Sequence, residues 1–257
     1  MGRRALEQLA TIRRFEAAGF RAWPATSVQY DGTWAMRLTA SHPSKRLNSV
    51  NPLDPSDHHR LDKRIERAAR LFEAYGRPLT FRISPLAAQV ISAHLDEQGW
   101  ATFSASKVMR LQLSEAAVAG AMHQIPLKDL NQFVSAAFEV HGYGADLRPG
   151  FTEVVSSIKA EAGFFVLKQE DVPVSVAICV RDGTLAGLAE VATAAAYRGK
   201  GFGRRLLLSA LKWAHSRGAG TAWLQVEEEN EPALALYRSL RFEEIYRYHY
   251  RRPTDMS

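Results

Sequence analysis

A glycine-rich, cationic loop that runs directly into a leucine-rich segment is the feature of this sequence that most restricts its fold. Residues 197–205, YRGKGFGRR, hold three glycines and four cationic side chains, and residues 206–208 are all leucine. Glycine lets a ligand approach the main chain closely. Where such residues precede a helix, successive N–H groups point into one space, and the helix dipole favours an anion there. The segment therefore predicts a phosphate-binding helix start; an ordinary glycine turn is the alternative.

Two common phosphate motifs do not fit this loop. A P-loop needs a Ser or Thr after its Gly-Lys pair, but Gly201 follows Lys200. A dinucleotide fingerprint needs a third glycine where this chain has Arg204 and Leu206. The pattern that remains is R-x-x-G-x-G, starting at Arg198.

Hydrophobic periodicity predicts the order of elements in the second half of the chain. Helices are expected over 126–142, 151–160, 202–217 and 230–240, and strands over 164–169, 174–181, 184–192, 221–228 and 242–252. Glu170-Asp171 and Asp182-Gly183 separate the first three strands, and Asp-Gly is a strong hairpin signal. These three strands are therefore predicted to form a meander.

This order of elements resembles the GNAT superfamily of acetyl-CoA-dependent N-acetyltransferases over roughly residues 124–251. The strand LAEVAT, the R-x-x-G-x-G loop, the strand AWLQV and the segment NEPALALYRSLRF follow one another in the family's order and at similar spacing. The resemblance implies an α/β (α+β) fold, with a mixed, mostly antiparallel sheet flanked by helices. It also implies acetyl-CoA as co-substrate and direct acetyl transfer to an amine in a ternary complex.

The resemblance assigns roles to particular positions. The strand through Val191 and Thr193 is expected to bind the pantetheine arm, and the Val191 N–H to donate to the developing oxyanion. Tyr237 matches the tyrosine that protonates the leaving thiolate, and Asn230 an asparagine that caps a helix and fixes the cofactor arm. Packing alone is the alternative for Tyr237, and capping alone for Asn230. The pyrophosphate is expected over Arg198, Gly199, Lys200, Gly201, Phe202, Gly203 and Arg204.

The general base and one helix end depart from the family pattern. In ribosomal-protein N-terminal acetyltransferases a glutamate lies twelve residues before the tyrosine; here that position is Gln225, which cannot accept the proton. Arg241 replaces a usual glycine, so helix 230–240 is expected to end with some strain or in a different way. The side chains that remain candidates for the base are Glu190, Glu227, His141 and His249.

An internal repeat relates the two halves of the chain. Gly76 and Gly99 match Gly218 and Arg241 at a common offset of 142. The same offset aligns the phosphate loop with residues 56–61, SDHHRL, which lack every glycine, and Tyr237 with Leu95. We therefore expect two domains: a degenerate GNAT-like domain without a phosphate loop over 1–115, and an acetyltransferase domain over 124–257. This arrangement is similar to tandem acetyltransferases such as the mycothiol synthase family; chance similarity of two α/β units is the alternative.

Other residues of the first half have a weaker signal. Core and turn roles are the alternative for a group that could face an acceptor cleft: Trp23, Trp34, Arg37, Asn48 and Asn51. Asp57, His58 and His59 invite a metal site, but adjacent histidines at a helix start are expected to point apart, so no metal is predicted.

Composition limits the remaining function classes. The 257 residues carry a net charge of +6, which permits an anionic partner, but the basic residues are interspersed with acidic ones and form no nucleic-acid motif. No apolar run could span a membrane, and the single Cys179 lies in an apolar strand, so we expect a cytoplasmic enzyme. A metabolite, an antibiotic or a protein could supply the amine, and the sequence does not indicate the oligomeric state. A non-catalytic CoA sensor, and less readily a nucleic-acid binder, are the alternatives.

Overall fold

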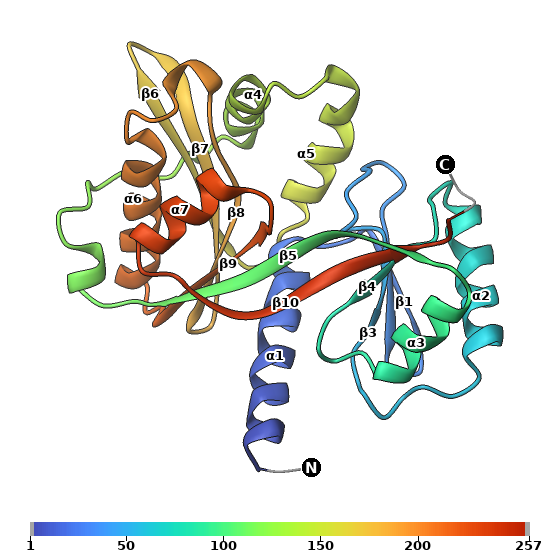
Figure 1. Ribbon diagram of the computed structural model, residues 1–257. Coiled ribbons are helices and arrows are strands. Elements are labelled where there is room, and N and C mark those ends of the chain that lie inside the picture. Colours follow the sequence, from blue (N-terminus) through green and yellow to red (C-terminus); the bar gives the residue numbers. More distant parts are fainter. Residues whose placement is uncertain (1–2, 255–257) are drawn as a thin grey trace. The chain divides into compact units, whose positions relative to one another are not determined.

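The computed structural model describes residues 3–254 and shows an α/β protein with two compact units (Figure 1). Of the described residues, the first unit contains 3–108, 226–230 and 244–254, and the second contains 109–225 and 231–243. The predicted domains, 1–115 and 124–257, differ from these units mainly near the C-terminus, where residues 226–230 and 244–254 belong to the first unit. The reason is the last strand, which pairs with β4 (Phe81–Ile83) in the first unit, His249 lying opposite Ile83.

The first unit is a mixed sheet with three helices. Strands β1 to β3 pair antiparallel, β3 pairs parallel with β4, and β4 pairs antiparallel with β10. The unit begins with α1 (Arg3–Ala22), β1 (Ser27–Asp31), β2 (Trp34–Leu38), β3 (Ser49–Pro52) and α2 (Leu61–Ala74). It continues through β4 to α3 (Gln89–Glu97), β5 (Ala101–Gln112), whose end lies in the second unit, and β10 (Glu243–Arg252).

The second unit repeats this arrangement. Strands β6 to β8 form the predicted antiparallel meander, and β8 pairs parallel with β9. Its helices are α4 (Leu130–His141), α5 (Arg148–Ser156), α6 (Phe202–Ser216) and α7 (Glu231–Ser239). Its strands are β6 (Glu161–Gln169), β7 (Val172–Asp182), β8 (Leu185–Thr193) and β9 (Thr221–Glu227), whose last residues belong to the first unit. Short 3₁₀ turns cover Ala116–Val118, Ala145–Leu147 and Ala195–Tyr197.

Local sequence signals account for the ends of these elements. The Asp129 carboxylate accepts hydrogen bonds from the amides of Asn131 and Gln132 and so caps α4. Gly142 ends the same helix with φ 71°, and Gly183 turns the β7–β8 hairpin with φ 59°. The predicted elements of the second half are thus confirmed, with boundaries shifted by a few residues.

The core of the second unit lies on both sides of β7. Every residue from Val174 to Val180 is buried, including Cys179, and both α4 and α6 pack against this strand. Burial raises the pKa of the Cys179 thiol to about 12, so this residue is an inert part of the core.

The two faces of the first unit's sheet differ in polarity. One face carries Trp34, Val50 and Phe81, which pack with residues of α2 and α3 in a hydrophobic core. The opposite face carries Arg82, whose guanidinium binds the carboxylate of Glu16 on α1. The residues proposed to face an acceptor cleft are buried in this unit, which supports the core alternative: Trp23, Trp34, Arg37, Asn48 and Asn51.

Hydrogen bonds repeat between the units at the predicted offset. Gly76 N donates to Glu73 O and Arg77 N to Phe72 O; residues 218 and 219 make the same bonds to 215 and 214. Residues 99 and 100 donate to 96 and 95, as 241 and 242 do to 238 and 237. The helices α2 and α6 therefore end in the same closing motif, as do α3 and α7.

Candidate functional site

The start of α6 presents a run of open backbone amides. Gly199 and Gly201 have φ values of 73° and 80°, and a Cβ at either position would meet nothing within 4 Å. Backbone conformation, not space, therefore requires glycine here. Among the described residues, the amides of 199–204 donate to no backbone acceptor. The first backbone hydrogen bond of the helix runs from Arg205 N to Gly201 O at 3.0 Å. We call residues 199–204 the amide cradle; it has the geometry of an anion site.

Gly203 brings this cradle against the end of β8. A Cβ on Gly203 would lie 3.0 Å from Thr193 Oγ1 and 3.6 Å from a methyl of Leu236 on α7. Thr193 is held in turn, because its hydroxyl lies 3.1 Å from Ser175 Oγ and its carbonyl accepts from Arg198 Nε at 3.2 Å. The cradle, the end of β8 and α7 are therefore neighbours.

Beyond Leu188, β8 is open on the side that faces β9. The parallel pairing of β8 with β9 ends at Leu188 and Leu224. A bulge then places Glu190 and Val191 opposite the single residue Ala177 of β7, and Glu190 takes φ 50°. Ala194 N donates to Val174 O on β7, so alternation along the strand directs the amides of Val191 and Thr193 away from β7. Both predicted pantetheine contacts thus face the open side.

The predicted acid and the predicted cap lie on α7 and just before it. Tyr237 is 6% exposed, and its ring centroid lies 5.8 Å from that of Phe242. Asn230 directly precedes α7, is exposed, and belongs to the first unit. The buried Tyr237 ring is thus consistent with a packing role, the alternative to catalysis. Tyr237 also directly follows Leu236, the residue that approaches Gly203 and so the cradle.

Glu190 lies in a half-buried cluster with His141 and Tyr143. The Tyr143 hydroxyl is 3.1 Å from Glu190 Oε2, and His141 Nε2 is 3.5 Å from the same oxygen. The side chains of His141 and Glu190 are 16% and 10% exposed. Burial lowers the pKa of His141 below its usual value, although the charge of Glu190 opposes this effect.

The structure separates the four candidates for the general base. Glu190 and His141 share this cluster in the second unit, whereas Glu227 and His249 belong to the first unit. There Glu227 forms an ion pair with Lys45 at 3.5 Å. The sequence prediction missed Tyr143; an aromatic residue directly after the helix-ending Gly142 is a signal that could have identified it.

In the first unit, the turn that corresponds to the cradle carries an acidic residue, Asp57, just before α2. The first residues of α2 and α6 are offset by 141, so Gly201 corresponds to Arg60, which takes φ 55°. The alignment of this loop at 142 was therefore off by one residue. Asp57 Oδ2 accepts from Thr33 N at 2.7 Å, and Oδ1 accepts from Arg64 at 2.7 Å. Although burial opposes it, these hydrogen bonds lower the pKa of Asp57 to about 2. The turn thus carries its own anion.

The histidines beside Asp57 differ from the prediction in one respect. The rings of His58 and His59 do not point apart but stack, with centroids 5.1 Å apart and an interplanar angle of 30°. Stacking is possible because the chain here has not yet entered α2, which begins at Leu61. Within residues 3–254, no group of three or more His, Cys, Asp or Glu side chains could hold a metal ion.

Arg241 ends α7 in the conformation that a glycine usually takes. Its φ is 65°, its amide donates to Arg238 O at 2.9 Å, and Phe242 N donates to Tyr237 O at 3.0 Å. Of the two expected outcomes, strain is the one observed, and the turn keeps its usual hydrogen bonds.

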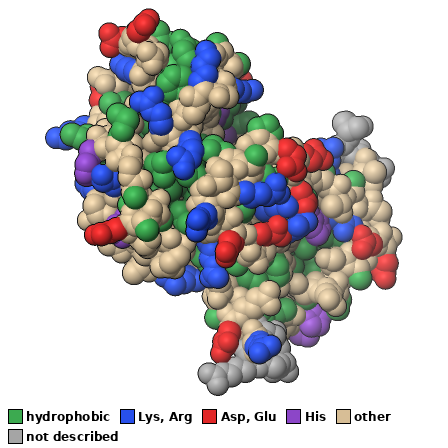
Figure 2. All heavy atoms as spheres, turned by 60° about the vertical axis from the view of Figure 1, so that its left-hand side comes forward, with side chains coloured by type: hydrophobic (Ala, Val, Ile, Leu, Met, Phe, Trp, Pro, Cys, Tyr) green, Lys and Arg blue, Asp and Glu red, His purple; other side chains and the backbone are tan. Residues whose placement is uncertain are grey.

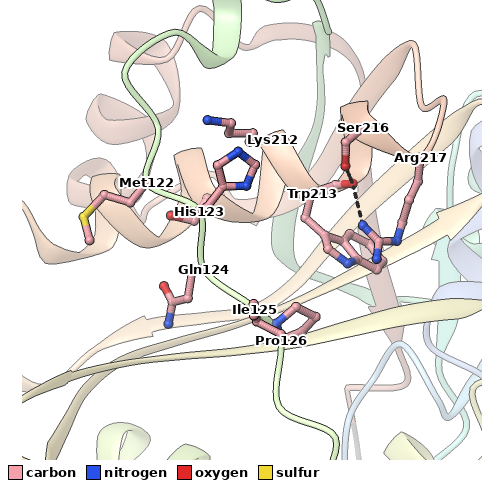
Figure 3. A pocket seen from close by; sticks show the side chains of 10 residues that line it. Met122, His123, Gln124, Ile125, Pro126, Lys212, Trp213, Ser216 and Arg217 are labelled. Atoms are coloured by element: carbon pink, nitrogen blue, oxygen red, sulfur yellow. Dashed lines mark hydrogen bonds between the residues drawn. The ribbon is translucent and has the colours of Figure 1, made fainter.

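A separate pocket of about 150 Å³ lies along the C-terminal half of α6 (Figure 3). Residues 122–126 close it from one side, Lys212 and Trp213 come from the helix, and Arg217 directly follows the helix. Lys212 donates to Ala121 O and Arg217 pairs with Glu161, so both cations are engaged. The volume is below the range typical of ligand sites, and the pocket is distinct from the amide cradle.

Comparison with known proteins gives one long family match. A family model described as "Probable histone acetyltransferase Rv0428c C-terminal" matches residues 9–251. The uncharacterized N-acetyltransferase YobR of Bacillus subtilis is 25% identical over 249 residues, covering 93% of this chain and 98% of YobR.

Solved structures of similar fold support the architecture. A GCN5-related N-acetyltransferase from Kribbella flavida has a TM-score of 0.67 at 18% identity, covering 94% of this chain and 95% of that one. A tandem GNAT protein from the clavulanic acid biosynthesis pathway has a TM-score of 0.63 at 15% identity, covering 92% and 86%. Finally, the helices within residues 3–254 include none with the length and apolar character to cross a membrane.

Proposed function

The chain belongs to the family described as probable histone acetyltransferase Rv0428c C-terminal, within the GNAT superfamily of acyltransferases, and we propose that it transfers an acetyl group from acetyl-CoA directly to a primary amine. Acetyl-CoA would supply the acetyl group as a thioester. The observation that carries the proposal is the amide cradle, residues 199–204, beside the open end of β8, with the half-buried carboxylate of Glu190 on the same strand.

The main chain of the second unit would hold the co-substrate. The amides of the cradle and the dipole of α6 suit a pyrophosphate, and the cations Arg198, Lys200 and Arg204 add favourable charge. The outward amides of Val191 and Thr193 suit an extended amide-containing chain laid beside the strand. The Val191 N–H would also donate to the oxygen that gains negative charge during transfer.

Glu190 would act as the general base. An alkyl ammonium must lose a proton before its nitrogen can attack, and a carboxylate held beside the reacting strand can accept that proton. Gln225 cannot serve in this way, and Glu190 is the candidate carboxylate within the second unit. Tyr237 would supply the proton to the departing thiolate from α7.

The acceptor class is a primary amine. The family description names histones, which makes the ammonium of a protein lysine one acceptor to test beside small amines. A nucleic-acid partner is less favoured, because Lys and Arg side chains are mixed with Asp and Glu on the face in Figure 2. We place the enzyme in the cytoplasm, and we propose that the first unit is a degenerate GNAT-like domain.

A screen of primary amines for CoA release tests this function. The panel should include small amines, aminoglycoside-type amines and lysine peptides, each with acetyl-CoA and the full-length protein. We expect one class to release CoA, and Glu190→Gln to lower that turnover by roughly 10² to 10⁴. Tight acetyl-CoA binding without transfer to any amine would instead favour a CoA-binding sensor.

A further inference from the structure

The cluster around Glu190 has a geometry that a structural carboxylate does not need. His141 is the last residue of α4, and Gly142 reverses the chain so that Tyr143 N donates to Phe138 O. The rings of His141 and Tyr143 therefore stack, with centroids 4.4 Å apart and planes within 8°. Both rings are directed to one oxygen, Glu190 Oε2.

The ring nitrogen of His141 that faces Glu190 is buried and makes no hydrogen bond. Nε2 has no partner within hydrogen-bonding geometry, although it lies 3.5 Å from Oε2. A buried polar atom without a partner is uncommon and costs stability. A small rotation of either side chain would close this gap, so the nitrogen is poised to exchange a proton with the carboxylate.

We infer, on the premise that Glu190 is the general base, that His141 relays the acceptor's proton from Glu190 to solvent while Tyr143 positions the carboxylate. The ammonium gives its proton to Glu190, which becomes a neutral carboxylic acid, and the amine lone pair becomes free to attack. Glu190 then passes the proton to Nε2 of the neutral imidazole and regains its negative charge. The imidazolium then loses the proton on Nδ1 to solvent, and the neutral ring returns to its starting tautomer before the next cycle, so neither charge nor protons accumulate.

The energetics of each transfer agree with this order. Burial keeps the imidazole neutral near pH 7, because it lowers the pKa of His141 below 6.5. Imidazole is nevertheless the stronger base in model peptides, by about two pKa units over a Glu carboxylate. A neutral His141 can therefore accept the proton, and the restored carboxylate stabilises the imidazolium that forms.

Tyr143 holds the carboxylate in place from an aromatic cluster. Its ring packs edge-on to Phe138 with centroids 5.5 Å apart and lies 6.2 Å from Phe151 of α5.

The charged groups on the elements around His141 are few. The cation on α5, Arg148, lies over Phe138 and donates to Ser135. The strand β7 also packs against α4, and its buried stretch, residues 174–180, carries no charged residue. Glu190 is accordingly the charge that acts on His141.

The variant His141→Gln tests the relay, with His215→Gln on α6 as the matched control. We expect His141→Gln to lower kcat by roughly 10- to 100-fold, less than Glu190→Gln, while KM for acetyl-CoA stays unchanged. In the parent enzyme kcat should fall as pH is lowered through the pKa of His141, because the protonated ring cannot accept a proton. That limb should vanish in His141→Gln. His141→Ala should regain activity when imidazole is added, and His215→Gln should match the parent.

Tyr143→Phe tests the positioning role separately. It keeps the stacked ring and removes only the hydroxyl, so we expect a lower kcat that still follows the parent's pH dependence. Tyr143→Phe with full activity would overturn its role.

Histidine NMR gives a readout that needs no acceptor. The pKa of His141 should be below 6.5 in the parent and lower still in Glu190→Gln, because the charge that raises it is gone. An unchanged value in Glu190→Gln would overturn the coupling.

Activity measurements on two variants distinguish the assignment of the base from the relay. If Glu190→Gln retains full activity, the assignment of the base is wrong. If Glu190→Gln is inactive but His141→Gln keeps the parent kcat and pH profile, the base stands and the relay is overturned.

Discussion

At the scale of single residues, Glu190 and Tyr237 occupy environments suited to opposite proton transfers. Glu190 lies on a strand bulge with φ 50°, a conformation that costs energy for a residue with a side chain, and it contacts two polar rings. Tyr237 is buried on α7 beside Phe242. The carboxylate is thus arranged to receive a proton, whereas a phenol has one to donate.

The variant Tyr237→Phe should separate chemistry from packing. The ring would still pack against Phe242, so we expect acetyl-CoA affinity to stay nearly unchanged while turnover falls by roughly 10² to 10⁴. Single-turnover measurements check this, since they remove product release from the rate. Full single-turnover activity would show that Tyr237 only packs and that another group supplies the proton.

The site residues differ in how far the sequence could predict them. The glycines of the cradle follow from backbone physics, since only an open main chain with positive φ offers consecutive amides to an anion. The contact of Tyr143 with Glu190 could not be predicted, because 47 positions separate the residues and local pattern does not fix such distant pairs. The prediction that His58 and His59 point apart is wrong for a related reason: side-chain direction in a turn depends on backbone angles that periodicity does not supply.

At the scale of elements, the site depends on how closely α6 approaches β8. Gly203 has no positive φ, so its role differs from that of Gly199 and Gly201: it lets the helix start lie against Thr193. A methyl group 3.0 Å from a hydroxyl is closer than van der Waals contact allows. The position of the cradle relative to the strand is therefore set by one missing side chain.

Gly203→Ala should weaken acetyl-CoA binding by displacing the cradle from β8. Calorimetry should record the loss, and the added change Thr193→Ala should restore part of the affinity, because it removes the hydroxyl that the new methyl meets. Thr193→Ala alone is the control and should bind acetyl-CoA like the parent, since only the Thr193 backbone is assigned to the site. Gly203→Ala with parent-like affinity would contradict this role.

Arg241→Gly should stabilise the second unit at the end of α7. Glycine takes φ 65° without steric cost, although it also adds freedom to the unfolded chain. We expect the free energy of unfolding to rise by about 0.5 to 1 kcal/mol, measured by urea denaturation. Ala235→Gly, in the exposed face of the same helix, is the control and should lower it by about 1 kcal/mol. A decrease with Arg241→Gly would show that the arginine makes contacts that outweigh its strain.

At the scale of the whole molecule, the two units share one order of strands and helices but differ in the loops that precede α2 and α6. The offset of 142 was predicted from two glycine positions and reappears in the hydrogen bonds that close α2, α3, α6 and α7. The assignment of β10 to the first unit was not predicted, since strand pairing over more than 150 positions leaves no local signal. In the loop before α2 the first unit carries the anion Asp57, whose carboxylate binds Thr33 and Arg64, whereas the corresponding residue of the second unit is the cation Arg198.

This contrast predicts that the protein binds acetyl-CoA at a single cradle, and calorimetric titration of full-length protein tests it most directly. The parent should bind one acetyl-CoA per chain. Gly201→Glu should abolish binding, because it adds strain and negative charge to the cradle. Arg60→Glu, the same charge at the corresponding position of the first unit, should leave stoichiometry and affinity unchanged. Two sites per chain, or binding that survives Gly201→Glu and is lost in Arg60→Glu, would contradict the account.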